Sequence, residues 1–345
     1  MIIGYVPQSP QLNHPADRRR VVYWADKRGH TITQDLTKKV DVYLLSGVAD
    51  FSQVESLQVK APVVIDLIDG YLLPQNPFID QLRGLGKTFV ARRIGPPKKY
   101  TRILSDALFK ADVVLCASIE QKAYIEVFNK NCYAILDFHE EFPLRSFDSR
   151  PIKKNKLFWE GQPYTISGLN FLEKPIRELG RENDFELSLV TDLQTHRFLG
   201  TFGNVETRNR LGNIPEILGH KLKLLPWSIQ NVIDETYGAA LSTLPLDPRN
   251  FLNPLKPENR LLIMWRLGVP CLTSPNLAYE RVMKISGNKN MCDGESEWLQ
   301  QMNMILENPD IQRSIVENGQ NYIMEFHRLA DTLQKWDEVF ETIVK

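Results

Sequence analysis

Two cations stand at the start of a predicted helix late in the chain. The run from Lys256 to Ser274 reads as a loop, a helix, a glycine stop and a buried strand. Pro257 suits the first turn of a helix, and Gly268 closes the helix where a left-handed residue is wanted. The free backbone amides of that turn, together with Lys256 and Arg260, are a combination that holds phosphate. An ordinary solvated helix start fits the same pattern.

Acids and a histidine follow apolar strands in the first half of the chain. The strand-like run Pro62–Ile68 leads to Asp69, which could accept the proton of an attacking hydroxyl. Asp69 is a better candidate than Asp66, because Asp66 alternates with apolar neighbours and so points into the sheet. His139, after the run Cys132–Leu136, is a second candidate. Structural roles, a helix cap for Asp69 and a core histidine for His139, stay open.

Alternating strands and helices would position these residues on parallel sheets. A first set of strand-like runs is Ile2–Val6, Val40–Ser46, Pro62–Ile68, Thr88–Ala91, Asp112–Ala117 and Cys132–Leu136. The helix-like runs between them include Ala16–Lys27 and Tyr100–Lys110. A polar, proline-containing segment, 142–155, breaks the pattern and is interpreted as an interdomain linker. A second alternating set follows, which begins with a strand at Lys156–Glu160 and a helix at Ser167–Gly180, and the chain from Ser296 onward reads as wholly helical. We therefore predict an α/β protein with two Rossmann-like domains, 1–148 and 153–327, and a C-terminal helix, 328–345, that packs back toward the first domain.

Length and composition agree with this organisation. A chain of 345 residues suits two domains of roughly 150–200 residues. The 42 basic and 42 acidic side chains cancel, so no bulk field favours nucleic acid as a partner. No run approaches the ~20 apolar residues of a membrane span, and the first residues lack a basic leader, so we expect a cytosolic protein. The four cysteines have neither zinc-ligand spacing nor the pattern of a disulfide framework.

The run 256–274 resembles the donor-binding helix of GT-B glycosyltransferases of the family 4 and family 1 type. In that family such an element holds the diphosphate of a nucleotide sugar. The run Ala111–Ser118 looks like the last part of the family's first domain, and Leu157–Gly161 looks like the strand and glycine turn that open the second. Glu297 to Leu299, and Trp336, resemble its closing helices. The resemblance implies a GT-B architecture with the active site in the cleft between two domains.

The sequence departs from the family 4 pattern across this loop and helix. Retaining members carry Glu, seven residues and a second Glu, and alignment puts Leu255 and Ile263 at those positions. The Arg and Lys expected after the first strand of the second domain are also missing, with Gln162 near one of them. Lys256 and Arg260 are the obvious substitutes for neutralising the leaving diphosphate. Retaining or inverting chemistry stays open, and so does a degenerate, non-catalytic member.

Ligands of open α/β sheets bind at the carboxyl ends of strands, which selects the remaining candidates. By resemblance Trp227 faces the nucleotide base, although it could equally cap the core, and Gly161 could be a simple turn glycine. Asp247 belongs to a long loop, 245–255, that could bind the hexose. The predicted donor-binding residues are Gly161, Gln162, Asp192, Trp227, Asp247, Lys256, Glu258, Asn259 and Arg260. The predicted acceptor side is His14, Arg18 and Asp66, and the predicted catalytic residues are Asp69 and His139.

A basic run lies between Arg83 and Arg102. It holds seven cations and no acid: Arg83, Lys87, Arg92, Arg93, Lys98, Lys99 and Arg102. One interpretation is a solvated basic face. The other is peripheral contact with anionic lipid headgroups on the inner face of a membrane.

These patterns predict a nucleotide-sugar-dependent glycosyltransferase (EC 2.4). It would move a sugar from a UDP- or GDP-sugar to a saccharide or lipid-linked acceptor, in polysaccharide or glycoconjugate biosynthesis. We expect no metal and no tightly bound cofactor. The alternative is a non-catalytic GT-B-like nucleotide-sugar-binding protein or partner subunit. A sugar-nucleotide epimerase would need a richer set of carboxylates and histidines.

Overall fold

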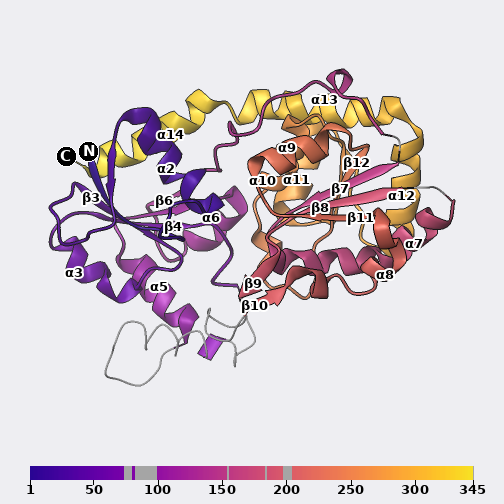
Figure 1. Ribbon diagram of the computed structural model, residues 1–345. Helices are drawn as coiled ribbons and strands as arrows, with labels where there is room; N and C mark the ends of the chain where they lie inside the picture. The colour runs from indigo at the N-terminus through magenta and orange to yellow at the C-terminus, as the bar shows by residue number, and fades with distance from the viewer. Residues whose placement is uncertain (74–79, 82–98, 154, 183–184, 197–203, 345) are drawn as a thin grey trace. The chain divides into compact units, whose positions relative to one another are not determined.

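The chain divides into two compact units in the computed structural model (Figure 1), which describes residues 1–73, 80–81, 99–153, 155–182, 185–196 and 204–344. The first unit comprises residues 1–138, 251–257 and 328–345, and the second comprises 139–250 and 258–327. The chain therefore leaves the second unit at residue 251 and returns to it at 258. The predicted strand Thr88–Ala91 and most of the basic run lie outside the described residues.

The first unit is built on a parallel sheet in the order β2-β1-β3-β4-β5-β6. Chain order reverses between β1 and β3, which lie side by side. The five predicted strands that fall in described residues are confirmed within one or two residues at each end, and the short β2 was not predicted. The strands are β1 (Ile2–Val6), β2 (Thr31–Thr33), β3 (Val42–Ser46), β4 (Val63–Leu67), β5 (Val113–Cys116) and β6 (Cys132–Ala134).

Helices cover both faces of this sheet. In β3, Val42 and Leu44 join a core with α2 (Val21–Arg28) and the C-terminal α14 (Leu329–Ile343). The alternate residues Tyr43 and Leu45 face the opposite core, whose helices are α3 (Val54–Gln58) and α5 (Tyr100–Lys110). A further helix, α6 (Ile119–Ile125), joins β5 to β6. The strand alternation thus gives the sheet two buried faces, as a parallel sheet requires.

The C-terminal helix is tied to α2 by aromatic packing. The rings of Trp24 and Trp336 stack with centroids 5.3 Å apart, and Phe340 lies 4.5 Å from Trp24. Trp24 Nε1 donates a hydrogen bond to Asp337 at 2.8 Å. Because these side chains are buried, α14 contributes part of the hydrophobic core of the first unit.

The predicted helix Ala16–Lys27 is wrong as a single element. The chain forms α1 (Pro15–Arg18), then Arg20 adopts φ −129° and ψ −112°, and α2 begins at Val21. Arg20 is fully buried and binds both oxygens of Asp66, at 2.6 and 2.7 Å, and Asp137 at 3.1 Å. The break in the helix therefore coincides with a buried guanidinium that contacts two carboxylates.

The second unit contains a parallel sheet in the order β11-β8-β7-β12-β13. Its chain order reverses between β7 and β12. A small antiparallel pair, β9 (Gln194–His196) with β10 (Asn204–Glu206), was not predicted. The strands of the parallel sheet are β7 (Lys156–Glu160), β8 (Glu186–Val190), β11 (Leu222–Leu225), β12 (Leu241–Leu244) and β13 (Cys271–Thr273).

One face of the second sheet packs against a large apolar core. That core is completed by the 3₁₀ helix η3 (Pro163–Leu172) and by α7 (Glu173–Glu182), α8 (Ile214–Leu218) and α12 (Glu295–Glu307), and Figure 1 labels these three α-helices. The predicted single helix from Ser167 to Gly180 is therefore two elements. The remaining helices are α9 (Ile229–Tyr237), α10 (Asn259–Arg266), α11 (Leu277–Ser286) and α13 (Pro309–Phe326). The helical character predicted from Ser296 onward is confirmed by α12, α13 and α14.

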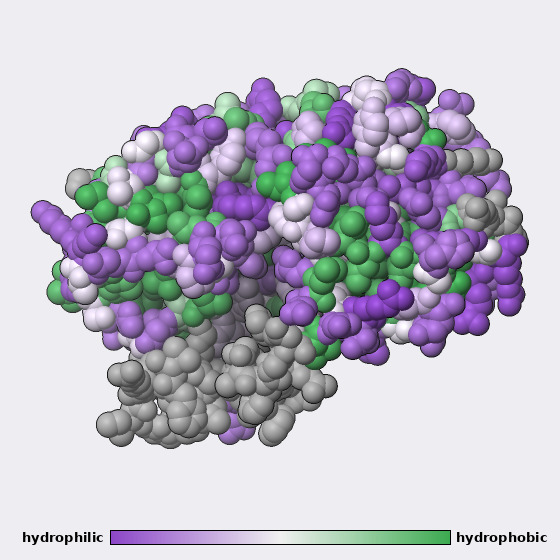
Figure 2. Space-filling model, viewed as in Figure 1, coloured by the Kyte–Doolittle hydropathy of each residue, from purple (hydrophilic) through white to green (hydrophobic). Residues whose placement is uncertain are grey.

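The surface mixes residue types. Figure 2 shows hydrophilic and hydrophobic residues interspersed on the viewed face. Across the described segments, no helix has both the length and the apolar character that crossing a bilayer demands. All four cysteines are buried and free, and Cys116 and Cys132 bring their sulfur atoms to 3.7 Å.

Candidate functional site

The helix predicted to begin at Pro257 begins two residues later. Glu258 is the N-cap residue of α10, and Asn259 is the first helical residue. Lys256 has extended backbone angles, φ −64° and ψ 133°, because the residue before a proline avoids the helical region. Lys256 and Pro257 therefore precede the helix, which corrects the prediction. Gly268 does end the helix with φ 72°, as predicted.

Arg260, in the first turn of α10, lies against the carboxyl end of β7. Its Nη2 donates a hydrogen bond to the backbone carbonyl of Glu160, and its Nε lies 3.6 Å from Glu160 Oε1. The guanidinium also stacks over Trp159, 5.0 Å from the ring centroid. These contacts hold a cation at the strand end where chain order in the sheet reverses, the usual ligand position in such sheets.

Gly161 is needed where Arg260 approaches. Its φ is 159°, and a Cβ added there would lie 3.0 Å from Thr165 Oγ1 and 3.2 Å from Arg260 Cζ. The next residue, Gln162, uses its carbonyl to accept the backbone amide and hydroxyl of Thr165, at 2.9 and 2.8 Å. A side chain at this position would therefore crowd Thr165 and Arg260. A role of this glycine turn in binding the diphosphate stays a prediction.

Glu160, which was not among the predicted site residues, contacts two residues that were. Trp227, after β11, donates from Nε1 to Glu160 Oε2 at 3.2 Å, so the predicted base-side aromatic and Arg260 meet at one carboxylate. The Glu160 side chain is only 7% exposed. An acid as the last residue of a strand, directly before Gly161, is the signal that could have identified it.

Other predicted donor residues occupy different positions. Glu258 receives a hydrogen bond from Arg281 of α11 at 2.8 Å and is buried. Asp247 binds Ser167 Oγ at 3.2 Å, and hydrogen bonds from Arg249 lower the pKa of its carboxyl group. Asp192 is exposed, and its backbone carbonyl accepts Thr207 Oγ1 at 2.5 Å. None of these contacts tests the predicted donor roles, which stay predictions.

The side chain of His139 contacts Asn259, the first residue of α10. Its Nε2 is 3.0 Å from Asn259 Oδ1, although 120 residues separate the two, and His139 is 4% exposed. The structure thus brings a predicted catalytic residue together with a predicted donor residue inside the second unit. Its role in catalysis stays a prediction.

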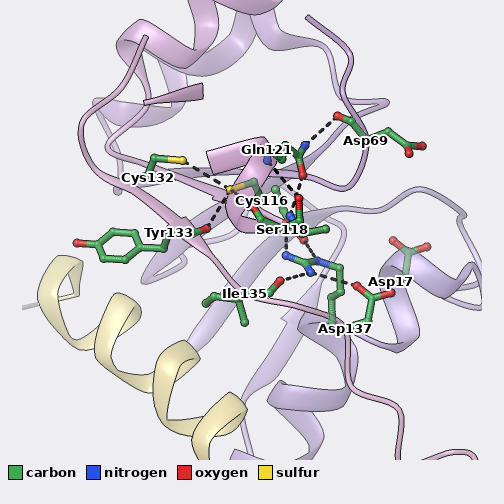
Figure 3. Close-up of polar contacts among 12 residues, drawn as sticks. Asp17, Asp69, Cys116, Ser118, Gln121, Cys132, Tyr133, Ile135 and Asp137 are labelled. Atoms are coloured by element: carbon green, nitrogen blue, oxygen red, sulfur yellow. Dashed lines mark hydrogen bonds and ion pairs between the residues drawn. The ribbon is translucent and has the colours of Figure 1, made fainter. Parts of the chain in front are cut away.

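Asp69 follows β4 in the first unit and faces Lys256, with Nζ 3.5 Å from Oδ1. Figure 3 shows Gln121 pointing toward the Asp69 backbone while the Asp69 carboxylate points away. Gln121 Nε2 donates to the Asp69 carbonyl at 2.8 Å, and Gln121 Oε1 accepts the Ala117 amide at 2.8 Å. Because Gln121 is fully buried, it fixes the turn that carries Asp69.

The three predicted acceptor residues make local or core contacts. Asp66 is 3% exposed and binds Arg20, so it points into the sheet, as its alternation indicated. His14 caps α1, with Nδ1 accepting the Ala16 amide at 3.2 Å. Arg18 donates to the Asn13 carbonyl at 3.3 Å. An acceptor role for these residues stays a prediction.

Most of the basic run is outside the described residues. Of its cations, the structure describes Lys99 and Arg102, and Arg102 Nε lies 3.2 Å from Asp106. Searched over the described ranges alone, the chain holds no group of three or more His, Cys, Asp or Glu side chains placed to bind a metal.

No protein-family model and no curated protein matches this chain. Solved structures match it in fold. HepE of Anabaena, in complex with UDP and glucose, is similar with a TM-score of 0.63 at 11% identity, over 99% of this chain and 99% of that one. A glycosyltransferase of Rickettsia africae is similar with a TM-score of 0.59 at 10% identity, over 100% of this chain and 98% of that one.

TarM of S. aureus is similar over 92% of this chain, with a TM-score of 0.61 at 10% identity. This chain spans 57% of the length of the TarM chain. At such low identity the likeness shows the fold alone. The fold is that of GT-B glycosyltransferases, which confirms the predicted fold class.

Proposed function

We propose that the protein is a glycosyltransferase that uses a nucleoside-diphosphate sugar. The observation that carries the proposal is Arg260, held at the first turn of α10 beside Gly161 and the end of β7. Helix amides, a cation and a glycine turn at a topological switch point are the elements that bind a diphosphate. The GT-B fold agrees with this assignment.

The second unit would bind the donor. The nucleotide base would lie beside Trp227 and the diphosphate beside Arg260, with UDP or GDP as the nucleotide. Solved structures of HepE and TarM contain UDP, which supports a uridine nucleotide as the first donor to test. Charge on the leaving diphosphate would be balanced by Arg260 and the α10 amides, without a metal ion.

The first unit would supply the acid–base chemistry. Asp69 would accept the proton of the acceptor hydroxyl while the hydroxyl oxygen bonds to the anomeric carbon of the donor sugar. The bond from that carbon to the diphosphate oxygen breaks, and the nucleoside diphosphate leaves. A base in this role fits direct displacement with inversion. Lys256, 3.5 Å away, would orient the carboxylate.

The acceptor would be a saccharide or a lipid-linked sugar. A cytosolic enzyme that contacts anionic lipid through residues 83–102 would meet a lipid-linked acceptor at the membrane surface. Sedimentation with anionic vesicles tests this. We expect co-sedimentation at low salt and release near ~0.5 M salt, where the Debye length is only a few Å. Binding that salt does not change would contradict it.

A non-catalytic nucleotide-sugar-binding protein is the second candidate. It is favoured by one observation: Leu255 and Ile263, at the positions of the two family 4 glutamates, are buried, 4% and 0% exposed. These positions carry apolar core residues in place of acids. A protein that kept the fold and the diphosphate site without turnover would show this replacement.

Two measurements separate these functions. Melting temperature is measured against UDP, GDP, UDP-glucose and free nucleosides, and a saturable rise with diphosphates supports donor binding. Release of labelled sugar from the nucleotide that binds then supports an enzyme. Binding without release, across a panel of acceptors, favours the second candidate. No rise with any nucleotide would contradict both.

A further inference from the structure

Glu160 lies between the two groups assigned to opposite ends of a nucleotide. Its Oε2 accepts Trp227 Nε1 at 3.2 Å, and its Oε1 lies 3.6 Å from Arg260 Nε. In a nucleoside diphosphate the ribose separates the base from the diphosphate. With the base beside Trp227 and the diphosphate beside Arg260, as proposed above, the ribose would lie beside Glu160.

The chemistry of Glu160 fits a ribose diol. An ionised carboxylate accepts about four hydrogen bonds. Within the described part of the chain, the carboxylate of Glu160 accepts one, from Trp227. The ion pair with Arg260 at 3.6 Å is longer than a hydrogen bond. Adjacent hydroxyl groups are donors that can fill the remaining capacity of a carboxylate.

A phosphate ligand alone does not explain why the carboxylate of Glu160 is buried and negatively charged at this place. The side chain is 7% exposed, and a buried carboxylate is costly unless hydrogen bonds compensate for lost water. Beside a diphosphate, this carboxylate repels the ligand. Hydroxyl donors from the same ligand would offset both costs.

We propose that Glu160 binds the ribose hydroxyls of the donor nucleotide and makes the site selective for ribonucleotides over deoxyribonucleotides. The inference rests on the proposed function, because it needs a nucleoside diphosphate in the second unit. It identifies the residue that recognises the ribose of the nucleotide and makes no statement about the sugar that is transferred.

The test measures how tightly the unaltered protein and two Glu160 variants bind a ribonucleotide and its deoxy forms. Dissociation constants are measured by calorimetry for whichever of UDP and GDP binds more tightly, and for its 2′-deoxy and 3′-deoxy forms. A hydrogen bond to a charged group predicts that the unaltered protein binds one or both deoxy forms about 10- to 100-fold more weakly. In Glu160→Ala that ratio should fall close to one, and in the isosteric Glu160→Gln it should be intermediate.

The ratio distinguishes ribose binding from a structural role. If Glu160 only holds Arg260 in place, both substitutions weaken binding of the ribonucleotide and the deoxynucleotide equally, and the ratio stays unchanged. If it only repels phosphate, both ligands bind the variants more tightly. Either result overturns the inference. Glu216→Gln, an exposed acid on α8, is the matched control and should change neither constant.

The results that contradict the proposed function differ from those that contradict only the role of Glu160. If the unaltered protein binds no nucleoside diphosphate, the proposed function is contradicted and the inference falls with it. If it binds UDP or GDP but does not distinguish the deoxy forms, the assignment of Glu160 is wrong while the proposed function stands.

Discussion

Lys256 Nζ lies 3.5 Å from Asp69 Oδ1, with both side chains largely buried, at 15% and 10% exposure. The sequence assigned the first to the donor diphosphate and the second to acceptor chemistry, yet the two contact each other inside one unit. The two opposite charges attract each other at this distance. A substitution at either residue therefore also removes an opposite charge from beside the other.

Replacing Asp69 tests the proposed base. Asp69→Asn should lower the turnover of labelled donor by about 10²–10⁴-fold and leave the dissociation constant of the nucleotide unchanged. Asp26→Asn, at a side chain 77% exposed in the same unit, is the control and should retain full turnover. Full activity of Asp69→Asn would remove Asp69 from the mechanism and leave His139 as the next candidate. A lower melting temperature with weaker donor binding would indicate a structural role.

Arg260 and Lys256 should differ in their effect on phosphate binding. Arg260→Ala removes a cation from the α10 start and should weaken binding of UDP or GDP by about 10- to 100-fold, with little change for the free nucleoside. Lys256→Ala should weaken diphosphate binding less, because Lys256 already neutralises Asp69. Calorimetry on both ligands measures this, with the exposed Arg208→Ala as control. Equal losses for diphosphate and nucleoside would show that Arg260 acts on the fold.

The parallel sheets could be predicted because buried strands carry continuous apolar runs. Strands β1, β4 and β7 appear within a residue of their predicted bounds, and α5 agrees at both ends. A break in one predicted helix coincides with contacts to residues far away in the sequence. At Arg20, for example, the helix is interrupted where the guanidinium binds Asp66 and Asp137, 46 and 117 residues away. Local periodicity contains no information about such partners.

The candidate site was predicted in part. Arg260 and Gly161 lie together, as the donor-helix pattern indicated. The start of α10 was placed too early, because proline was read as a first-turn residue when its effect on Lys256 was to extend the backbone. Glu160 was missed because a terminal strand residue has no periodic signature. Its role depends on Trp227, 67 residues away.

Glu235 should make the second unit sensitive to acid. Burial alone raises the pKa of Glu235, but hydrogen bonds from Lys156, Lys223 and Ser188 outweigh it and bring the pKa to about 2. A pKa depressed in the folded state contributes stability above the unfolded value near 4.5, and that stability is lost as pH falls from there toward 2. Urea unfolding of the unaltered protein should lose on the order of 2 kcal/mol between pH 5 and pH 2 that Glu235→Gln does not lose.

The comparison needs a control for general acid effects. Glu216→Gln, on an exposed side chain of α8, should keep the pH dependence of the unaltered protein. If Glu235→Gln shows the same loss of unfolding free energy as the unaltered protein over this range, the depressed pKa is wrong.

Gly319 should resist substitution although it lies within a helix. Alanine is favoured over glycine in a helix by about 1 kcal/mol, so propensity alone predicts that Gly319→Ala stabilises α13. Packing predicts the opposite, because a Cβ at Gly319 would overlap the indole ring of Trp265 on α10, which is fully buried. Overpacking typically costs about 1–3 kcal/mol, so the net free energy of unfolding should fall.

Since Trp265 and Arg260 share α10, the nucleotide affinity of Gly319→Ala should fall together with its stability. Ser314→Ala, at an exposed position on α13, is the control and should change the free energy of unfolding by no more than about 0.5 kcal/mol and leave nucleotide affinity unchanged. A rise in melting temperature for Gly319→Ala would show that α13 moves away from α10 at little cost.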